Sequence, residues 1–140
     1  MSRRELDVLF AASSPGRVPA GLTRGTVLVA TGTLLARPLA KIAGALAWKG
    51  KVFSADGASL VNLVTPFAVH AVRANVHVDK SLSDGAPCIV IDYSKTSFIA
   101  KFVRDEIREV EPDIFLGKAY VLGLPTVFFA LETMQRLRNS

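Results

Sequence analysis

Apolar and polar residues alternate in parts of this 140-residue chain, with the two-residue period of β-strands. The clearest stretch runs from His70 to Asp79, where valine and alanine take every second position and polar residues fill the positions between. One face of such a strand is buried and the other is wet, as in an antiparallel sheet. The same reasoning predicts strands at residues 26–31, 51–55, 59–64, 70–79, 88–93, from about 104, 114–122 and 126–132.

Turn residues separate most of these strands closely enough to make hairpins. Asp56-Gly57 and Asp84-Gly85 are strong hairpin signals, and Pro112-Asp113 and the Gly123-Leu124-Pro125 turn divide the last three strands. Eight antiparallel strands with short links close naturally into a barrel, because closure removes exposed strand edges. The sequence therefore predicts a mainly β protein. The expected fold is an eight-stranded antiparallel barrel, with an interior that is either filled by side chains or holds one small ligand.

One helix is predicted before the first strand, and a second between the first and second strands. Ser2 and Glu5 have capping-box spacing, and apolar residues follow at helical intervals, so a short helix is expected from about Arg3 to Ala12. The proline- and glycine-rich segment that ends at Arg24 is interpreted as an irregular connection. A further apolar stripe at helical spacing predicts a short helix that covers one barrel end; it comprises Leu35, Leu39, Ile42 and Leu46.

One ambiguous segment lies later, where apolar residues between 96 and 110 also fit a helical period. One or two helical turns are expected near residues 97–102, before the strand that starts at about Arg104. The chain is predicted to form one domain over residues 1–140, with a helical N-terminal region at about 1–48.

The composition favours a protein with either a greasy interior or lipid contacts. Half of the residues are hydrophobic, and the mean hydropathy is +0.35. A membrane-spanning helix is not expected, since Arg37 and Lys41 interrupt the most apolar stretch. No signal-peptide pattern is recognised at the N-terminus. The single cysteine, Cys88, fits a reducing compartment, so the protein is expected in the cytoplasm.

The formal charge of +5 is concentrated in the N-terminal third. Residues 1–51 hold eight arginines and lysines against Glu5 and Asp7. A solvated basic face explains this, and weak contact with an anionic membrane surface is the alternative. Nucleic acid is not expected as a partner, because aromatic residues do not interleave with the basic ones and no nucleic-acid motif is recognised.

The residue pattern predicts neither a metal site nor a cofactor. The chain lacks a glycine-rich phosphate loop and a nucleophile elbow. His70 and His77 are seven residues apart on one predicted strand, so their side chains face opposite ways and do not share a metal. Cys88 is interpreted as a small core residue, since it lies among apolar neighbours.

Charge is concentrated on one predicted strand, residues 104–109, and its register decides its chemistry. Alternation sends Arg104, Glu106 and Arg108 to one face and Asp105 to the other. A solvated face with salt bridges is one interpretation. If Asp105 enters the barrel instead, burial raises its pKa, as a general base requires. In the opposite register the two arginines and Glu106 would be buried, and they would have to bind one another or an anionic head group.

Three aromatic residues are the remaining candidates. Tyr93 shares the predicted inward face of Ile89 and Ile91, and Tyr120 shares a face with Lys118. Either phenol could hydrogen-bond a ligand or a protein acceptor. Trp48, at the junction between helix and strand, is interpreted as a plug at one barrel end, with ligand contact as the alternative.

Two stretches resemble a known family. Trp48-Lys49-Gly50-Lys51-Val52-Phe53 resembles the W-x-G-K-x-F element of lipocalin-like, calycin-type barrels of bacteria. Residues 104–110, followed by Ile114-Phe115-Leu116-Gly117-Lys118, are similar to the late hairpin of small bacterial proteins of that kind. The resemblance implies an apolar cavity for small apolar molecules, with isomerase or cyclase activity in a few members. It implies no catalytic residue.

Three functional hypotheses follow. The first is binding of a small hydrophobic or fatty-acid-like ligand in the barrel, through residues Trp48, Tyr93, Arg104, Arg108 and Tyr120, with Asp105 helping to orient it. The second is an isomerase or cyclase on the same scaffold, with Asp105 or Glu106 as general base and a tyrosine as proton donor. The third is a peripheral membrane protein that docks through the basic helix near Leu39 to Leu46.

Overall fold

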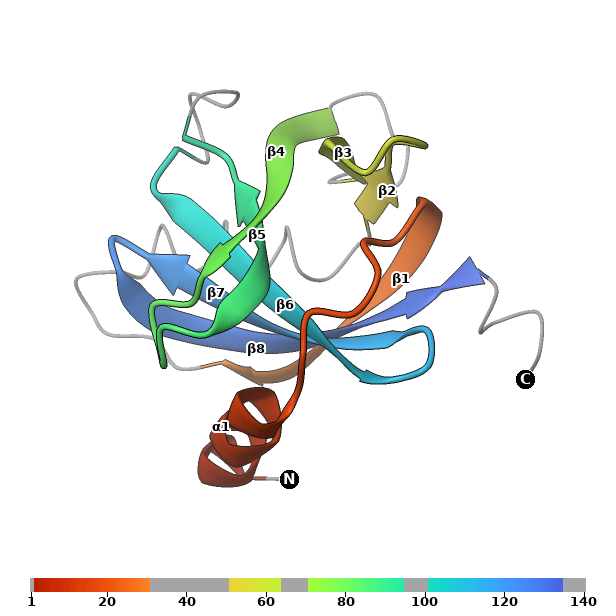
Figure 1. Ribbon diagram of the computed structural model, residues 1–140. Coiled ribbons are helices and arrows are strands. Elements are labelled where there is room, and N and C mark those ends of the chain that lie inside the picture. The colour runs from red at the N-terminus through yellow and green to blue at the C-terminus, as the bar shows by residue number, and fades with distance from the viewer. Residues whose placement is uncertain (1, 31–50, 64–70, 95–100, 135–140) are drawn as a thin grey trace.

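The computed structural model describes residues 2–30, 51–63, 71–94 and 101–134. Helix α1 (Arg3–Ala12) precedes eight strands that form one closed barrel in the order of the chain, with β8 pairing back onto β1 (Figure 1). The strands are β1 (Gly21–Ala30), β2 (Lys51–Phe53), β3 (Ser59–Leu63), β4 (Ala71–Lys80), β5 (Pro87–Asp92), β6 (Val103–Glu111), β7 (Ile114–Val121) and β8 (Leu124–Thr133). Every pairing is antiparallel. The predicted closed antiparallel barrel with an N-terminal helix is therefore confirmed.

Helix α1 forms where the capping box predicted it. The Ser2 hydroxyl accepts a hydrogen bond from the Glu5 backbone N–H, and the Glu5 carboxylate accepts one from the Ser2 backbone N–H, each at 3.2 Å. Leu6 and Phe10 are buried against the outside of the barrel. The helix ends at Ser13, whose backbone is extended. No helix in the described part of the chain is long and apolar enough to cross a membrane.

The interpretation of residues up to Arg24 as an irregular connection was wrong at its end. Strand β1 begins at Gly21, because Gly21 and Leu22 pair with β2 while the residues from Thr23 onward pair with β8. The inward Thr23 is buried and its neighbours are exposed or partly so, which is a strand pattern that the nearby glycines hide. Strand β8 also starts earlier than predicted, at Leu124, with a register shift opposite Ala119 and Tyr120.

The two ends of the barrel differ in their connections. At the end where β5 finishes and β6 begins, here called the β5–β6 rim, strands are joined by residues 31–50, 64–70 and 93–102 and by a two-residue turn. At the opposite end, the β6–β7 rim, the links are short and Val18 packs against the core. The helix predicted from Leu35 to Leu46, and residues 97–100 of the helical turns predicted near 97–102, lie outside the described residues.

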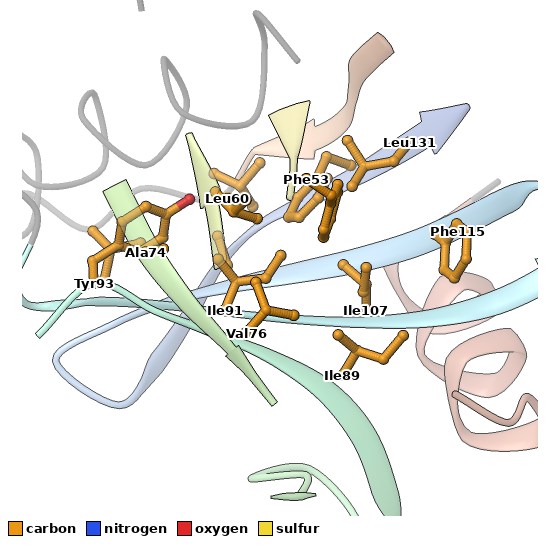
Figure 2. Packing of buried hydrophobic residues seen from close by; sticks show 14 of the residues in the cluster. Phe53, Leu60, Ala74, Val76, Ile89, Ile91, Tyr93, Ile107, Phe115 and Leu131 are labelled. Carbon is orange, nitrogen blue, oxygen red and sulfur yellow. The ribbon is translucent and has the colours of Figure 1, made fainter. Parts of the chain in front are cut away.

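Apolar side chains point into the barrel interior and pack against one another (Figure 2). They are contributed by β2 to β8, and the cluster comprises Phe53, Leu60, Ala74, Val76, Ile89, Ile91, Tyr93, Val103, Ile107, Phe115, Ala119, Val121, Val127, Phe129 and Leu131. The Phe129 ring lies over Gly117, its cross-strand partner, so closely that a Cβ added to Gly117 would overlap it. Gly117 therefore makes room for an aromatic ring in the core.

A second buried layer lies outside the barrel, under α1. Strand β5 is buried on both faces, with Ile89 and Ile91 inside and Cys88 and Val90 in the outer cluster. Its unbroken apolar run is the sequence pattern of a strand covered on both sides. Leu6 and Phe10 of α1 belong to the same outer cluster.

Arg108 ties α1 to the barrel. Its guanidinium forms a bidentate pair with Asp84, with both N···O distances 2.7 Å, and donates to the carbonyl oxygens of Pro87 and Ala86 at 3.1 Å. It also donates to the Phe10 carbonyl oxygen at 2.8 Å and lies 4.4 Å from the centre of the Phe10 ring. A cation at the carbonyl end of a helix is electrostatically favourable. This one side chain thus joins α1, the β4–β5 turn and β6.

We predict that the Asp84–Arg108 pair makes the protein sensitive to acid. The hydrogen bonds from Arg108 lower the pKa of Asp84 from 3.8 to about 2. Because the folded-state pKa is lower than the unfolded one, the stabilisation is complete above about pH 4 and is lost as the pH falls toward 2. After allowance for partial exposure of Asp84, this amounts to about 1–2 kcal/mol.

Urea unfolding of the wild type and of Asp84→Asn between pH 2 and 6 measures this contribution. We expect the difference in free energy of unfolding to shrink as the pH falls. Asp79→Asn, which alters an exposed carboxylate of the same hairpin, is the matched control and should leave the pH profile of the wild type unchanged. A difference that stays constant down to pH 2 would contradict the prediction.

Candidate functional site

Three polar side chains meet inside the apolar barrel: Lys51, Tyr93 and Asp105, here called the interior triad. The Lys51 Nζ lies 3.2 Å from Asp105 Oδ2 and donates a hydrogen bond to the Tyr93 hydroxyl at 3.0 Å. The Tyr93 hydroxyl donates to Asp105 Oδ2 at 3.3 Å. All three residues are at least 99 % buried, which makes this an ion pair held almost entirely away from water.

The triad lies near the β5–β6 rim because each member sits at a strand end there. Lys51 is the first residue of β2, Tyr93 directly follows β5, and Asp105 is the third residue of β6. Figure 2 shows the Tyr93 hydroxyl directed into the interior. Opposite Asp105 on β7 stands Ala119, whose side chain is a single methyl group.

Burial shifts the proton affinities of the two charged groups in opposite directions. Desolvation lowers the pKa of Lys51 and raises the pKa of Asp105, and in each case the charge of the partner opposes the shift. The Lys51 Nζ also lies 5.7 Å from the centre of the Tyr93 ring and 5.5 Å from that of Phe129, so aromatic faces share in stabilising the cation. The proton affinities of Lys51 and Asp105 therefore lie closer together than those of an exposed lysine and an exposed aspartate.

The backbone around Lys51 is fixed by Thr23 of β1. The Thr23 hydroxyl donates to the Lys51 carbonyl oxygen at 2.8 Å and accepts from the Lys51 N–H at 3.3 Å. Thr23 is itself buried. The side chain of a neighbouring strand thus holds the first residue of the very short strand β2 in place.

The structure shows which face of β6 enters the barrel, a choice that the sequence left open. Asp105 and Ile107 face the interior, and Arg104, Glu106 and Arg108 face outward. The two candidates Tyr93 and Asp105 are brought together. Lys51 was not among the candidates, although its alternation with the inward-facing Phe53 places it on the interior face.

Four sequence candidates lie outside the barrel, away from the triad. The Glu106 carboxylate accepts from the Ser81 hydroxyl and from the Leu82 N–H, and forms an ion pair with Arg104 at 3.0 Å. Arg108 is bound to Asp84 and α1 as described. Tyr120 is also on the outer face, and its buried hydroxyl makes no hydrogen bond within the described residues. The structure therefore does not bring Arg104, Glu106, Arg108 or Tyr120 into the interior.

The remaining candidates contribute little to a site. Trp48 and His70 lie outside the described residues. His77 is exposed near Asp79. Burial raises the pKa of Cys88 to about 12, so its thiol stays protonated at neutral pH, as expected for a core residue. No group of three metal-ligating side chains occurs among the described residues.

A separate cleft of about 730 Å³ opens at the β6–β7 rim. It is lined by residues 17–20 and 109–113 and by Phe115, Thr133 and Met134. Its Glu109 carboxylate accepts a hydrogen bond from the Asp113 N–H, which fixes the β6–β7 turn. This cleft lies at the barrel end opposite the triad, and its lining mixes charged with apolar residues. None of its charged residues is fully buried, unlike Lys51 and Asp105, so the interior triad remains the stronger candidate.

Comparison with known proteins supports the fold alone. No protein-family model matches the chain, and no curated protein matches it. A crystal structure of a protein from Thermomonospora curvata is similar, with a TM-score of 0.60 and 19 % sequence identity over 95 % of this chain and 88 % of that chain. The chain therefore shares the fold of that protein, a closed barrel of eight antiparallel strands in this chain.

We predict that removing one member of the buried ion pair destabilises the protein far more than removing both. Lys51→Met leaves the Asp105 carboxylate buried without its cation, which should cost about 3–5 kcal/mol of unfolding free energy. The double variant Lys51→Met/Asp105→Leu should recover most of that loss, since apolar residues often replace a buried pair without penalty. Urea unfolding of the four proteins gives the coupling energy.

Lys118→Met is the matched lysine control. Lys118 is also largely buried, but its partner Asp7 is 46 % exposed, so its carboxylate stays hydrated when the lysine is removed. We expect a smaller loss than for Lys51→Met. Additive effects of the Lys51 and Asp105 substitutions would show that the two side chains do not interact.

Proposed function

We propose that the barrel binds a small hydrophobic molecule with a polar, fatty-acid-like head group, and that the interior triad holds that head group. The observation that carries this proposal is the complete burial of Lys51, Tyr93 and Asp105 within an apolar core. Folding alone is served as well or better by apolar residues at such positions. Ligand sites, in contrast, combine an apolar lining with a few convergent polar groups.

The geometry of Tyr93 suits such a role. Its 3.3 Å hydrogen bond to Asp105 is long for an O–H···O bond, which usually measures about 2.7–2.8 Å. A weak bond is readily exchanged for one to a carboxylate or carbonyl oxygen of a ligand. The apolar part of the ligand would gain about 25 cal/mol for each Å² that it buries.

The position of the triad gives the ligand a direction of approach. The proposed head-group site lies near the β5–β6 rim, where the longest connections of the barrel begin and end. We also propose that the chain is related to the lipocalin-like, calycin-type barrels, because those barrels commonly bind small apolar molecules. We place the protein in the cytoplasm, as the single cysteine suggests.

Fluorescence titration with a dansyl-labelled fatty acid tests the binding proposal. The wild type should bind the probe, and Tyr93→Phe should weaken binding about tenfold, as expected for the loss of one hydrogen bond to the head group. Tyr120→Phe removes the same hydroxyl from the outer face and should leave the affinity unchanged. Absence of binding by the wild type, or equal effects of the two tyrosine variants, would refute the proposal.

A second candidate function is acid–base catalysis, an isomerase or cyclase on the same site. The observation that favours it is the raised pKa of Asp105, caused by burial, because a general base needs a pKa close to the working pH. Asp105 would take a proton from the substrate and Tyr93 would donate one. Glu106 is not part of this proposal, since its carboxylate is bound outside the barrel.

Carbon-13 NMR titration of the aspartate carboxyl groups tests this second candidate. We expect Asp105 to titrate above the usual value of about 3.9. Its pKa should rise further in Lys51→Met, because the lysine charge lowers it in the wild type. A normal pKa for Asp105 in the wild type would eliminate the catalytic proposal and leave the binding proposal intact.

A further inference from the structure

Three exposed apolar side chains gather at the β5–β6 rim, and they are here called the rim patch: Phe102, Leu122 and Leu124. The exposed fractions are 45 % for Phe102, 62 % for Leu122 and 59 % for Leu124. Phe102 precedes β6, Leu122 lies in the β7–β8 turn and Leu124 begins β8, so the patch is assembled from distant parts of the chain. The Leu122 N–H donates to the Phe102 carbonyl oxygen at 3.1 Å, which holds the two parts together.

The backbone at Leu122 is unfavourable for a leucine. Leu122 and Gly123 form a two-residue hairpin loop in which both residues have positive φ, 52° and 80°. Such loops favour Asn-Gly or Asp-Gly, because a residue with a Cβ and no local hydrogen bond is strained in that conformation. In the β6–β7 turn the second residue, Asp113, also has a positive φ, 64°, and aspartate is a residue that tolerates it.

Leu122 therefore has two disadvantages for the folded protein in water: backbone strain and an exposed apolar side chain. Asparagine at this position would avoid both. The arrangement is reasonable if the side chain leaves water in a bound state. A transfer into an apolar phase then gives a free-energy gain that folding does not provide.

A positive charge lies next to the patch. The Lys101 Nζ lies 5.0 Å from the centre of the Phe102 ring, so a cation accompanies the aromatic side chain. Apolar side chains together with lysines that reach past them are the combination found where proteins contact an anionic bilayer.

We propose that the rim patch docks onto an anionic lipid bilayer, with Phe102, Leu122 and Leu124 entering the head-group region and Lys101 contacting lipid phosphates. The patch residues differ from residues 39–46, for which the sequence suggested membrane contact and which lie outside the described residues. Docking here would turn the β5–β6 rim, and hence the interior triad, toward the membrane. The docking itself needs no bound ligand and is independent of the proposed binding function.

Vesicle flotation measures docking directly. Vesicles of phosphatidylcholine alone and of phosphatidylcholine with phosphatidylglycerol are mixed with ligand-free protein at low and high salt. We expect flotation with the anionic vesicles that decreases in high salt, as it does for exposed charges. Leu122→Asn should lower the bound fraction about tenfold, while its free energy of unfolding should equal or exceed that of the wild type. Lys101→Gln should weaken binding to anionic vesicles only.

Leu82→Asn is the matched control, because Leu82 is 53 % exposed in the β4–β5 turn at the opposite rim. It should bind vesicles like the wild type. Equal losses in Leu122→Asn and Leu82→Asn, or no flotation of the wild type at low salt, would overturn the proposal. So would concentration-dependent dimerisation that Leu122→Asn abolishes, because the patch would then bind a second copy of the chain.

Discussion

The need to compensate buried charge on both faces of one strand is the constraint on which this structure depends. Strand β6 carries Asp105 into the barrel and Arg104, Glu106 and Arg108 out of it, and all except Arg104 are fully buried. A buried charge is tolerated only when it is paired and hydrogen-bonded. Inside the barrel the pairing comes from Lys51 and Tyr93. Outside, it comes from Asp84, from the β4–β5 turn and from the carbonyl end of α1.

The outer pairing explains why the helix lies where it does. Apolar contacts through Leu6 and Phe10 bury one side of α1, but apolar contacts alone do not fix its position along the strand. The hydrogen bond from Arg108 to the Phe10 carbonyl oxygen and the 2.6 Å pair between Lys118 and Asp7 do so, because both require particular atoms to meet. Polar contacts thus determine the placement of α1, and apolar burial supplies much of its stability.

The strand pattern predicted much of this fold, because alternation and turn residues act locally. The capping box placed α1, and Asp56-Gly57 and Asp84-Gly85 marked hairpins that the structure contains. Alternation also predicted correctly that the Tyr93 side chain faces the barrel interior. It did not decide the register of β6, since either face of that strand carries charge, and only the partners on other strands distinguish the two. Lys51 escaped notice because a lysine at the start of a strand is usually exposed, and its burial depends on residues more than forty positions away.

The start of β1 shows a different limit. Glycines at positions 21 and 25 suggested a loop, yet Gly25 pairs with Leu131 inside the sheet. A strand is stabilised by its neighbours as much as by its own residues, so local propensity gives way where two strands offer pairing.

Strand β6 separates two sets of side chains by odd and even sequence number, and this separation bears on how the protein can change. Substitutions at the odd positions from Val103 to Ile107 alter the interior, whereas the even positions keep the helix and turn attached. The chemistry of the barrel interior and the attachment of α1 and the β4–β5 turn can therefore vary independently, although adjacent residues determine them. A scaffold of this kind allows its interior to be redesigned for new molecules while the outer network is left intact.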